Sequence, residues 1–151
     1  MQIRAGIVFS VLAAALVVVG TLLTLEFDRA KPAVALAARD AADLGAQWHA
    51  YTPTTFDQDL TSQRTVLVAV HADWCTDCAA QAPVIARLMR EPQFRNSVGY
   101  VVNFDRERKF LAAHRVRQQS TLIVFKDGVE VARSVADTNE ARIRALFERG
   151  I

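Results

Sequence analysis

The two cysteines of this sequence, Cys75 and Cys78, are the residues whose type and spacing point most directly to chemistry. They stand in the segment Trp74-Cys75-Thr76-Asp77-Cys78, and a Cys-x-x-Cys pair can close a disulfide within itself. So short a loop cross-links nothing distant, which excludes a disulfide scaffold, and two cysteines exclude a four-cysteine zinc site within one chain. The pattern therefore indicates reversible two-electron exchange of disulfides.

The two sulfurs are expected to have different roles. A helix pattern begins at Cys75, and the unpaired N–H groups and positive dipole of a helix N-terminus favour a thiolate there. Cys75 is therefore the expected nucleophile toward a partner disulfide. Cys78, one turn further along, is expected to attack the Cys75 sulfur of the mixed disulfide and to release the partner. The alternative is a pair of inert buried thiols or one structural disulfide.

Four neighbouring side chains are candidates for tuning the pair or binding substrate. Trp74 is expected to cover the sulfurs and to offer partners an apolar contact, unless it is a core residue. Thr76 and Asp77 lie between the cysteines, and Asp77 suits a helix N-terminus but disfavours a thiolate beside it. These two effects of Asp77 oppose each other, and the alternative is that Asp77 only caps the helix. Because the dipeptide between the cysteines is not basic, we expect a fairly reducing pair. His71 is either a donor or base for Cys75 or an ordinary residue at the end of a strand.

A metal-binding or delivery module is the second hypothesis. Cys75 and Cys78, with His71 or Ser120, could hold a soft metal such as Cu(I) or Zn(II). Against it, Met89 is the only methionine beyond residue 48, so a Met cluster is absent from that part of the sequence. A third hypothesis is a docking domain without catalysis. No organic cofactor is expected, because the sequence has no Gly-rich phosphate-binding loop.

The N-terminal residues predict export across a membrane. Ala5 to Leu25 is a run of 21 residues without a charge, and a helix of that length extends about 31 Å, which matches a bilayer core. Arg4 precedes the run, which favours a cytoplasmic N-terminus. Two small-x-small sites within residues 33–37 allow the alternative of a cleaved signal peptide. We expect residues 1–30 to be an anchor or signal, 31–48 an Ala-rich tether, and 49–151 the domain.

The net charge and the pattern of apolar residues limit the possible function and fold of the domain. The formal net charge of the chain is only +2 at pH 7, which gives no reason to expect binding to nucleic acid. Thr52-Pro53 is typical of a helix start. Short apolar runs and periodic segments predict strands over 65–70, 98–104, 121–125 and 129–135, helices over 52–60, 75–90, 107–114 and 139–149, and a hairpin turn over 126–128. This order predicts an α/β fold with a mixed sheet of about four strands covered on both faces.

On these residues the sequence resembles a thioredoxin-fold protein over roughly residues 51–151. The segment Ala72-Asp73-Trp74-Cys75 is also similar to the C-terminal domain of the bacterial inner-membrane thiol:disulfide interchange reductase. Residues 118–122 are similar to a group of exported bacterial thioredoxin-like proteins. The motifs that carry the resemblance are the strand 66–70 running into 71–78, Pro83 five residues after Cys78, Phe104-Asp105 after the next strand, and the strand signature 121–128.

The resemblance implies a thiol:disulfide oxidoreductase that acts on protein thiols and disulfides. It further implies a periplasmic domain held at the bacterial inner membrane by one span, or a soluble periplasmic protein if the N-terminus is cleaved. A reductase in an oxidising compartment needs electrons, so a membrane electron-donor protein is an expected partner.

Two departures from the family pattern concern the site. Ser120 stands where the family has a cis-proline, and we expect the Gln119-Ser120 bond to be trans because a cis bond before a residue other than proline costs about 3–4 kcal/mol. The family uses this loop, here Gln119, Ser120 and Thr121, to hold substrate, and the Ser120 hydroxyl is expected to approach the sulfurs instead. Ala69 stands where the family has a buried Asp, so the family's usual proton acceptor is missing.

Overall fold

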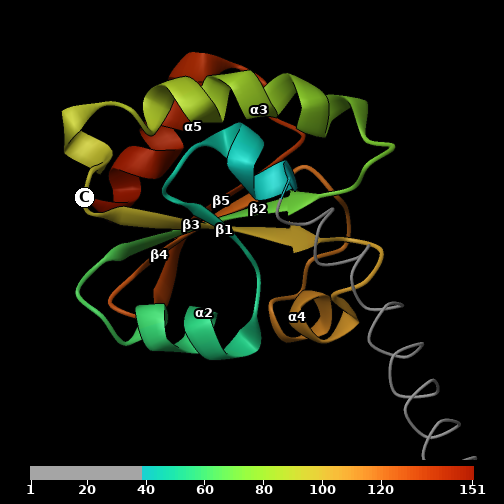
Figure 1. The fold of residues 1–151 in the computed structure, drawn as a ribbon, viewed down its shortest axis with the longest axis horizontal. Helices are drawn as coiled ribbons and strands as arrows, with labels where there is room; N and C mark the ends of the chain where they lie inside the picture. Colours follow the sequence, from blue (N-terminus) through green and yellow to red (C-terminus); the bar gives the residue numbers. More distant parts are fainter. Residues whose placement is uncertain (1–38) are drawn as a thin grey trace, which may run out of the picture. The chain divides into compact units, whose positions relative to one another are not determined.

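A five-stranded mixed sheet with helices on both faces organises residues 39–151, which are the residues that the computed structural model describes (Figure 1). The strand order is β1-β3-β2-β4-β5, with β3 parallel to β1 and β2, and with antiparallel β2–β4 and β4–β5 pairs. The strands are β1 Trp48–Ala50, β2 Thr65–His71, β3 Ser97–Asn103, β4 Thr121–Lys126 and β5 Val129–Val135. The helices are α2 Pro53–Leu60, α3 Thr76–Leu88, α4 Arg108–Ala113 and α5 Glu140–Phe147, with 3-10 helices at Pro92–Phe94 and Glu148–Gly150.

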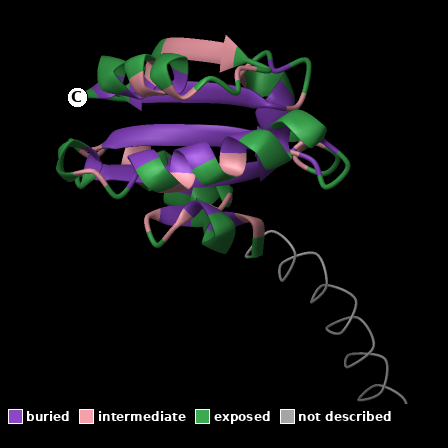
Figure 2. Cartoon of the chain, turned by 90° about the horizontal axis from the view of Figure 1, so that it is seen from above, coloured by how far each residue is buried: buried purple, intermediate pink, exposed green. Residues whose placement is uncertain are grey.

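Two apolar clusters, one on each face of the sheet, hold these layers together. Helices α3 and α5 cover one face, and α2 and α4 cover the other (Figure 1). Side chains alternate between the faces of a strand, so Leu67 and Ala69 of β2 join the cluster under α3 and α5, whereas Val68 and Val70 join the opposite one. The buried residues therefore gather in strands β2, β3 and β4, while the outer faces of the helices stay exposed (Figure 2). Strand β2, buried on both faces, ends at the Cys-x-x-Cys segment.

The predicted α/β fold is confirmed, including the four predicted strands, the four helices and the Thr52 cap, whose side chain accepts from the Thr55 N–H. One strand was missed. The sheet has five strands rather than about four, because β1 adds three residues at the edge beside β3. A strand of three residues is too short to show the alternation that identifies strands in a sequence.

The structure includes part of the predicted tether 31–48 in the folded unit. Residues 39–44 form a helical segment, and Ala41 and Leu44 are buried in the same apolar cluster as Trp48. The predicted membrane span over residues 5–25 lies outside the described residues. Within residues 39–151, no helix has the length and apolar character needed to cross a bilayer.

The packing of Trp48 on β3 gives a prediction about stability. Trp48 is the parallel neighbour of Gly99, and a Cβ atom at Gly99 would lie 2.2 Å from Trp48 Cδ2. Overpacking of this kind typically costs about 1–3 kcal/mol. Gly99→Ala is therefore expected to lower the free energy of unfolding by that amount, as measured by urea denaturation.

The control for this prediction is the same substitution in a Trp48→Leu background. A smaller side chain removes the clashing ring, so Gly99→Ala should cost clearly less there, and the difference is the coupling energy of the pair. An equal cost in both backgrounds would mean that backbone conformation, and not the Trp48 ring, requires glycine at position 99.

Candidate active site

The two cysteines form a disulfide at the N-terminal end of α3, as their spacing predicts. Their Cα atoms are 5.3 Å apart, and both residues are buried. Cys75 is the N-cap residue of α3, and its sulfur accepts a hydrogen bond from the Cys78 N–H at 3.1 Å. The end of β2 and the start of α3 therefore fix both sulfurs from either side.

Ser120 is the other residue in direct contact with the sulfurs. Its Oγ lies 2.9 Å from Cys75 Sγ and 3.2 Å from Cys78 Sγ, which confirms the predicted approach of this hydroxyl. Among residues 39–151 no peptide bond is cis, so the bond before Ser120 is trans, as predicted. Ser120 adopts a φ of 56°, and its N–H donates to the Val70 carbonyl oxygen at 2.8 Å. The β2–β4 pairing thereby holds the hydroxyl at the disulfide.

Gln81 is a site residue that the sequence reasoning missed. Its side chain is buried, and its Nε2 donates to the carbonyl oxygens of Ser120 at 3.3 Å and Asp137 at 2.8 Å. These bonds tie α3 to the loops before and after the β4–β5 hairpin. The available signal was a polar residue three positions after Cys78, on the face of the helix that is otherwise apolar.

The hydrogen-bond partners favour a thiolate on Cys75 over one on Cys78. The Cys78 N–H and the N-terminal end of α3 lie at Cys75 and stabilise negative charge there. The Ser120 hydroxyl is within reach of both sulfurs but is nearer to Cys75. Cys78 Sγ instead lies 3.8 Å from the Val70 carbonyl oxygen, and an acceptor at that position favours a protonated thiol. Asp77, in the first turn, is exposed to solvent. The geometry thus agrees with Cys75 as the attacking sulfur.

The remaining predicted site residues differ in their exposure to solvent and in their hydrogen bonds. Trp74 is 61% exposed, which rules out a core role, and its Nε1 donates to Asp105 Oδ2 at 2.9 Å. Thr76 is exposed, and Gln119 is partly buried. Thr121 is buried, but its hydroxyl donates to the Gln118 carbonyl oxygen at 2.8 Å. Trp74 therefore offers an accessible aromatic surface next to Cys75. Thr121 instead stabilises the turn before β4 through a local hydrogen bond.

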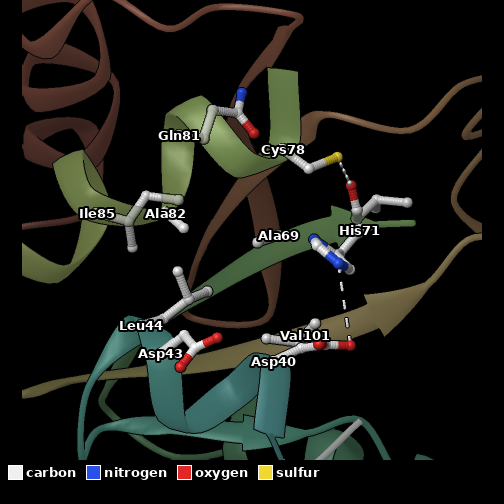
Figure 3. A pocket seen from close by; sticks show the side chains of 11 residues that line it. Asp40, Asp43, Leu44, Ala69, His71, Cys78, Gln81, Ala82, Ile85 and Val101 are labelled. Carbon is white, nitrogen blue, oxygen red and sulfur yellow. Dashed lines mark hydrogen bonds and ion pairs between the residues drawn. The ribbon is translucent and has the colours of Figure 1, made fainter. Parts of the chain in front are cut away.

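His71, at the end of β2, is paired with carboxylates. Its Nε2 lies 3.9 Å from Asp40 Oδ2 (Figure 3). The same atom lies 3.8 Å from Asp73 Oδ1. Burial is the main cause that raises the pKa of Asp40 above its ordinary value, and the charge of His71 opposes this. In the oxidised chain the two sulfurs are joined in a disulfide and are not thiolate ligands. The hypothetical metal set of Cys75, Cys78 and His71 therefore stays a prediction for the reduced chain.

Comparisons with known proteins match the part of the chain that holds the disulfide. A family model described as thioredoxin matches residues 47–149. A thioredoxin of Pseudomonas aeruginosa is 32% identical over 101 residues, which cover 66% of this chain and 93% of that protein. Thioredoxin Asp f 29 of Aspergillus fumigatus is 36% identical over 83 residues, covering 55% and 74% of the two chains. The crystal structure of Trxlp from Edwardsiella tarda EIB202 matches with a TM-score of 0.64 and 37% identity, covering 65% of this chain and 95% of that one.

Proposed function

Because the chain belongs to the thioredoxin family and is therefore a protein-disulfide oxidoreductase, we propose that it reduces disulfides of exported protein partners through Cys75 and Cys78. The single observation that carries this proposal is the asymmetry of the disulfide's surroundings. The Cys78 N–H and the α3 terminus lie at Cys75, and the Ser120 hydroxyl is nearer to Cys75 than to Cys78, whereas a carbonyl acceptor faces Cys78. This arrangement provides a nucleophile and a resolving thiol in one turn of helix.

The proposed cycle begins with the reduced chain. The Cys75 thiolate attacks one sulfur of a partner disulfide, forms a mixed disulfide, and expels the other partner sulfur as a thiolate that takes up a proton. Cys78 then loses its proton and attacks Cys75 Sγ, which breaks the bond between Cys75 and the partner. The second partner thiol leaves, and two electrons have passed from the chain to the partner. No cofactor takes part in either displacement.

The exposed side chain of Trp74 supports the proposal that the substrates are proteins. The indole is exposed and is fixed by its hydrogen bond to Asp105, so it presents a rigid apolar surface directly before the nucleophile. Large aromatic side chains of this kind contribute much of the contact energy in protein interfaces. A peptide chain that carries a disulfide would contact Trp74 while its sulfur meets Cys75.

We propose further that the domain works outside the cytoplasm of a bacterium, held at the inner membrane by residues 5–25. The support is the uncharged run of the sequence and the basic residue before it. A dithiol in an oxidising compartment must be re-reduced, so the proposal includes a membrane protein that supplies electrons. The anchor would raise the local concentration of that donor. Protease digestion of intact spheroplasts tests this placement, since protection of the domain would contradict it.

The reduction potential of the full-length chain tests the direction of exchange. Equilibration in glutathione or dithiothreitol buffers, with bound metal assayed on the same sample, is expected to give a value near the thioredoxin potential of about −270 mV. A potential near about −120 mV would identify an oxidant of exported proteins instead. Stoichiometric metal without thiol exchange would favour the delivery module that the sequence left open.

A further inference from the structure

A cavity of about 50 Å³ extends from Cys78 to the helical segment 39–44 (Figure 3). Apolar side chains form much of its wall, among them Ala69 of β2 and Ile85 of α3. A buried space needs only about 10–15 Å³ to hold a water molecule, together with polar partners. This cavity is therefore large enough for a few water molecules. Its polar side chains would supply the hydrogen-bond partners of that water.

Asp40 lies at the end of the cavity away from Cys78, and the His71 side chain lies between the two (Figure 3). The carboxylate and the imidazole lie 3.9 Å apart. Other charged groups face Asp40 as well: Asp73 and Asp43 add to the burial that raises its pKa, while Arg106 and His71 oppose it. A general base works best when its pKa lies near the working pH, because it must both accept a proton and release it again. A raised pKa brings the Asp40 carboxyl group closer to that condition.

The second displacement of the cycle requires such a group. Cys78 must lose its proton before it can attack, yet its sulfur is buried and faces the Val70 carbonyl oxygen. We propose that Asp40, paired with His71, takes the Cys78 proton through water in this cavity. The inference rests on the proposed function and deepens it, because it assigns the proton transfer of the resolving step to a segment that precedes the family match at residues 47–149.

The step balances as follows. In the mixed disulfide the Cys78 thiol gives its proton to a cavity water, which passes a proton to the Asp40 carboxylate. The Cys78 thiolate forms a bond to Cys75 Sγ, the bond from Cys75 to the partner breaks, and the partner leaves as a thiolate. The Asp40 carboxyl group then returns its proton to solvent or to that thiolate. When the disulfide is reduced, the same path runs in reverse.

Rapid mixing of the reduced full-length chain with a small aromatic disulfide separates the two displacements. The first releases one coloured thiol by attack of Cys75, and the second releases another by attack of Cys78. Asp40→Asn is expected to slow the second release about tenfold at pH 7 and to change its pH profile, with the first release within about twofold of wild type. Asp43→Asn is the matched control, because Asp43 lines the same cavity from the same segment and is exposed.

Each outcome has a definite meaning. A slow second release in Asp40→Asn alone supports the inference, and an unchanged first release shows that the variant is folded. Equal rates of the second release in both variants would refute the inference but leave the proposed function standing. If the wild-type chain shows neither release, the proposed function fails, and the inference fails with it.

Discussion

Cys78→Ser is expected to accumulate a covalent mixed disulfide between Cys75 and its partners, whereas Cys75→Ser is expected to accumulate almost none. The first variant keeps the thiolate that the α3 terminus, the Cys78 backbone N–H and the Ser120 hydroxyl stabilise, but it lacks the thiol that resolves the adduct. The second variant keeps only the sulfur beside the Val70 carbonyl oxygen. We expect at least a tenfold difference in trapped adduct.

Full-length chains expressed in a bacterial host, quenched with acid and separated without reductant, provide this measurement. Mass spectrometry of the adduct identifies the partner and the bonded cysteine. A variant lacking both cysteines sets the background. Equal trapping by the two single variants would overturn the assignment of roles, and trapping by Cys75→Ser alone would reverse it.

Ser120→Ala is expected to slow the attack of the reduced chain on disulfides about tenfold at neutral pH. The hydroxyl is 2.9 Å from Cys75 Sγ in the oxidised chain, and the thiolate would accept its hydrogen in the reduced chain. A hydrogen bond to a charged group contributes about 1.5–3 kcal/mol, and about 1.4 kcal/mol corresponds to a factor of ten in rate. The rate of alkylation of Cys75 by iodoacetamide, followed against pH, reports the thiolate directly.

Thr121→Val is the matched control for this prediction. It also removes one buried hydroxyl from the same turn, but that hydroxyl donates to the Gln118 carbonyl oxygen and not to a sulfur. Alanine suits the φ of 56° at position 120 no worse than serine does, so both variants should keep the fold. A similar loss of rate in both would mean that the turn as a whole, rather than the Ser120 hydroxyl, sets the reactivity of Cys75.

Local signals account for what the sequence predicted correctly. Thr52 before Pro53 marks a helix start, and the runs at 65–70 and 121–125 are apolar almost throughout because both faces of those strands are covered. The Cys-x-x-Cys spacing likewise fixes a disulfide without reference to the rest of the chain. The hydroxyl of Ser120 was expected near the sulfurs because the resemblance places this loop there.

The contacts that sequence reasoning missed join residues far apart in the chain. Asp40 meets His71 only after the segment 39–44 has packed beside β2, and an alanine-rich stretch gives no sign of that packing. Gln81 reaches Ser120 and Asp137, which lie in two separate loops. Nothing in the local pattern around either residue specifies its partner, so only the assembled fold could identify them.

The position of Ser120 has a consequence for how the two sulfurs share one donor. A hydroxyl carries a single hydrogen, and this one lies within reach of both sulfurs, so it serves one sulfur at a time. The backbone of Ser120 is anchored through its N–H to Val70 and through its carbonyl oxygen to Gln81 and Ala136. Rotation about one side-chain bond is then the only movement required. We expect the hydroxyl to donate to Cys75 Sγ while Cys75 is the thiolate, before the partner binds, and to Cys78 Sγ when Cys78 becomes the thiolate in the resolving step. One side chain would thus serve both displacements.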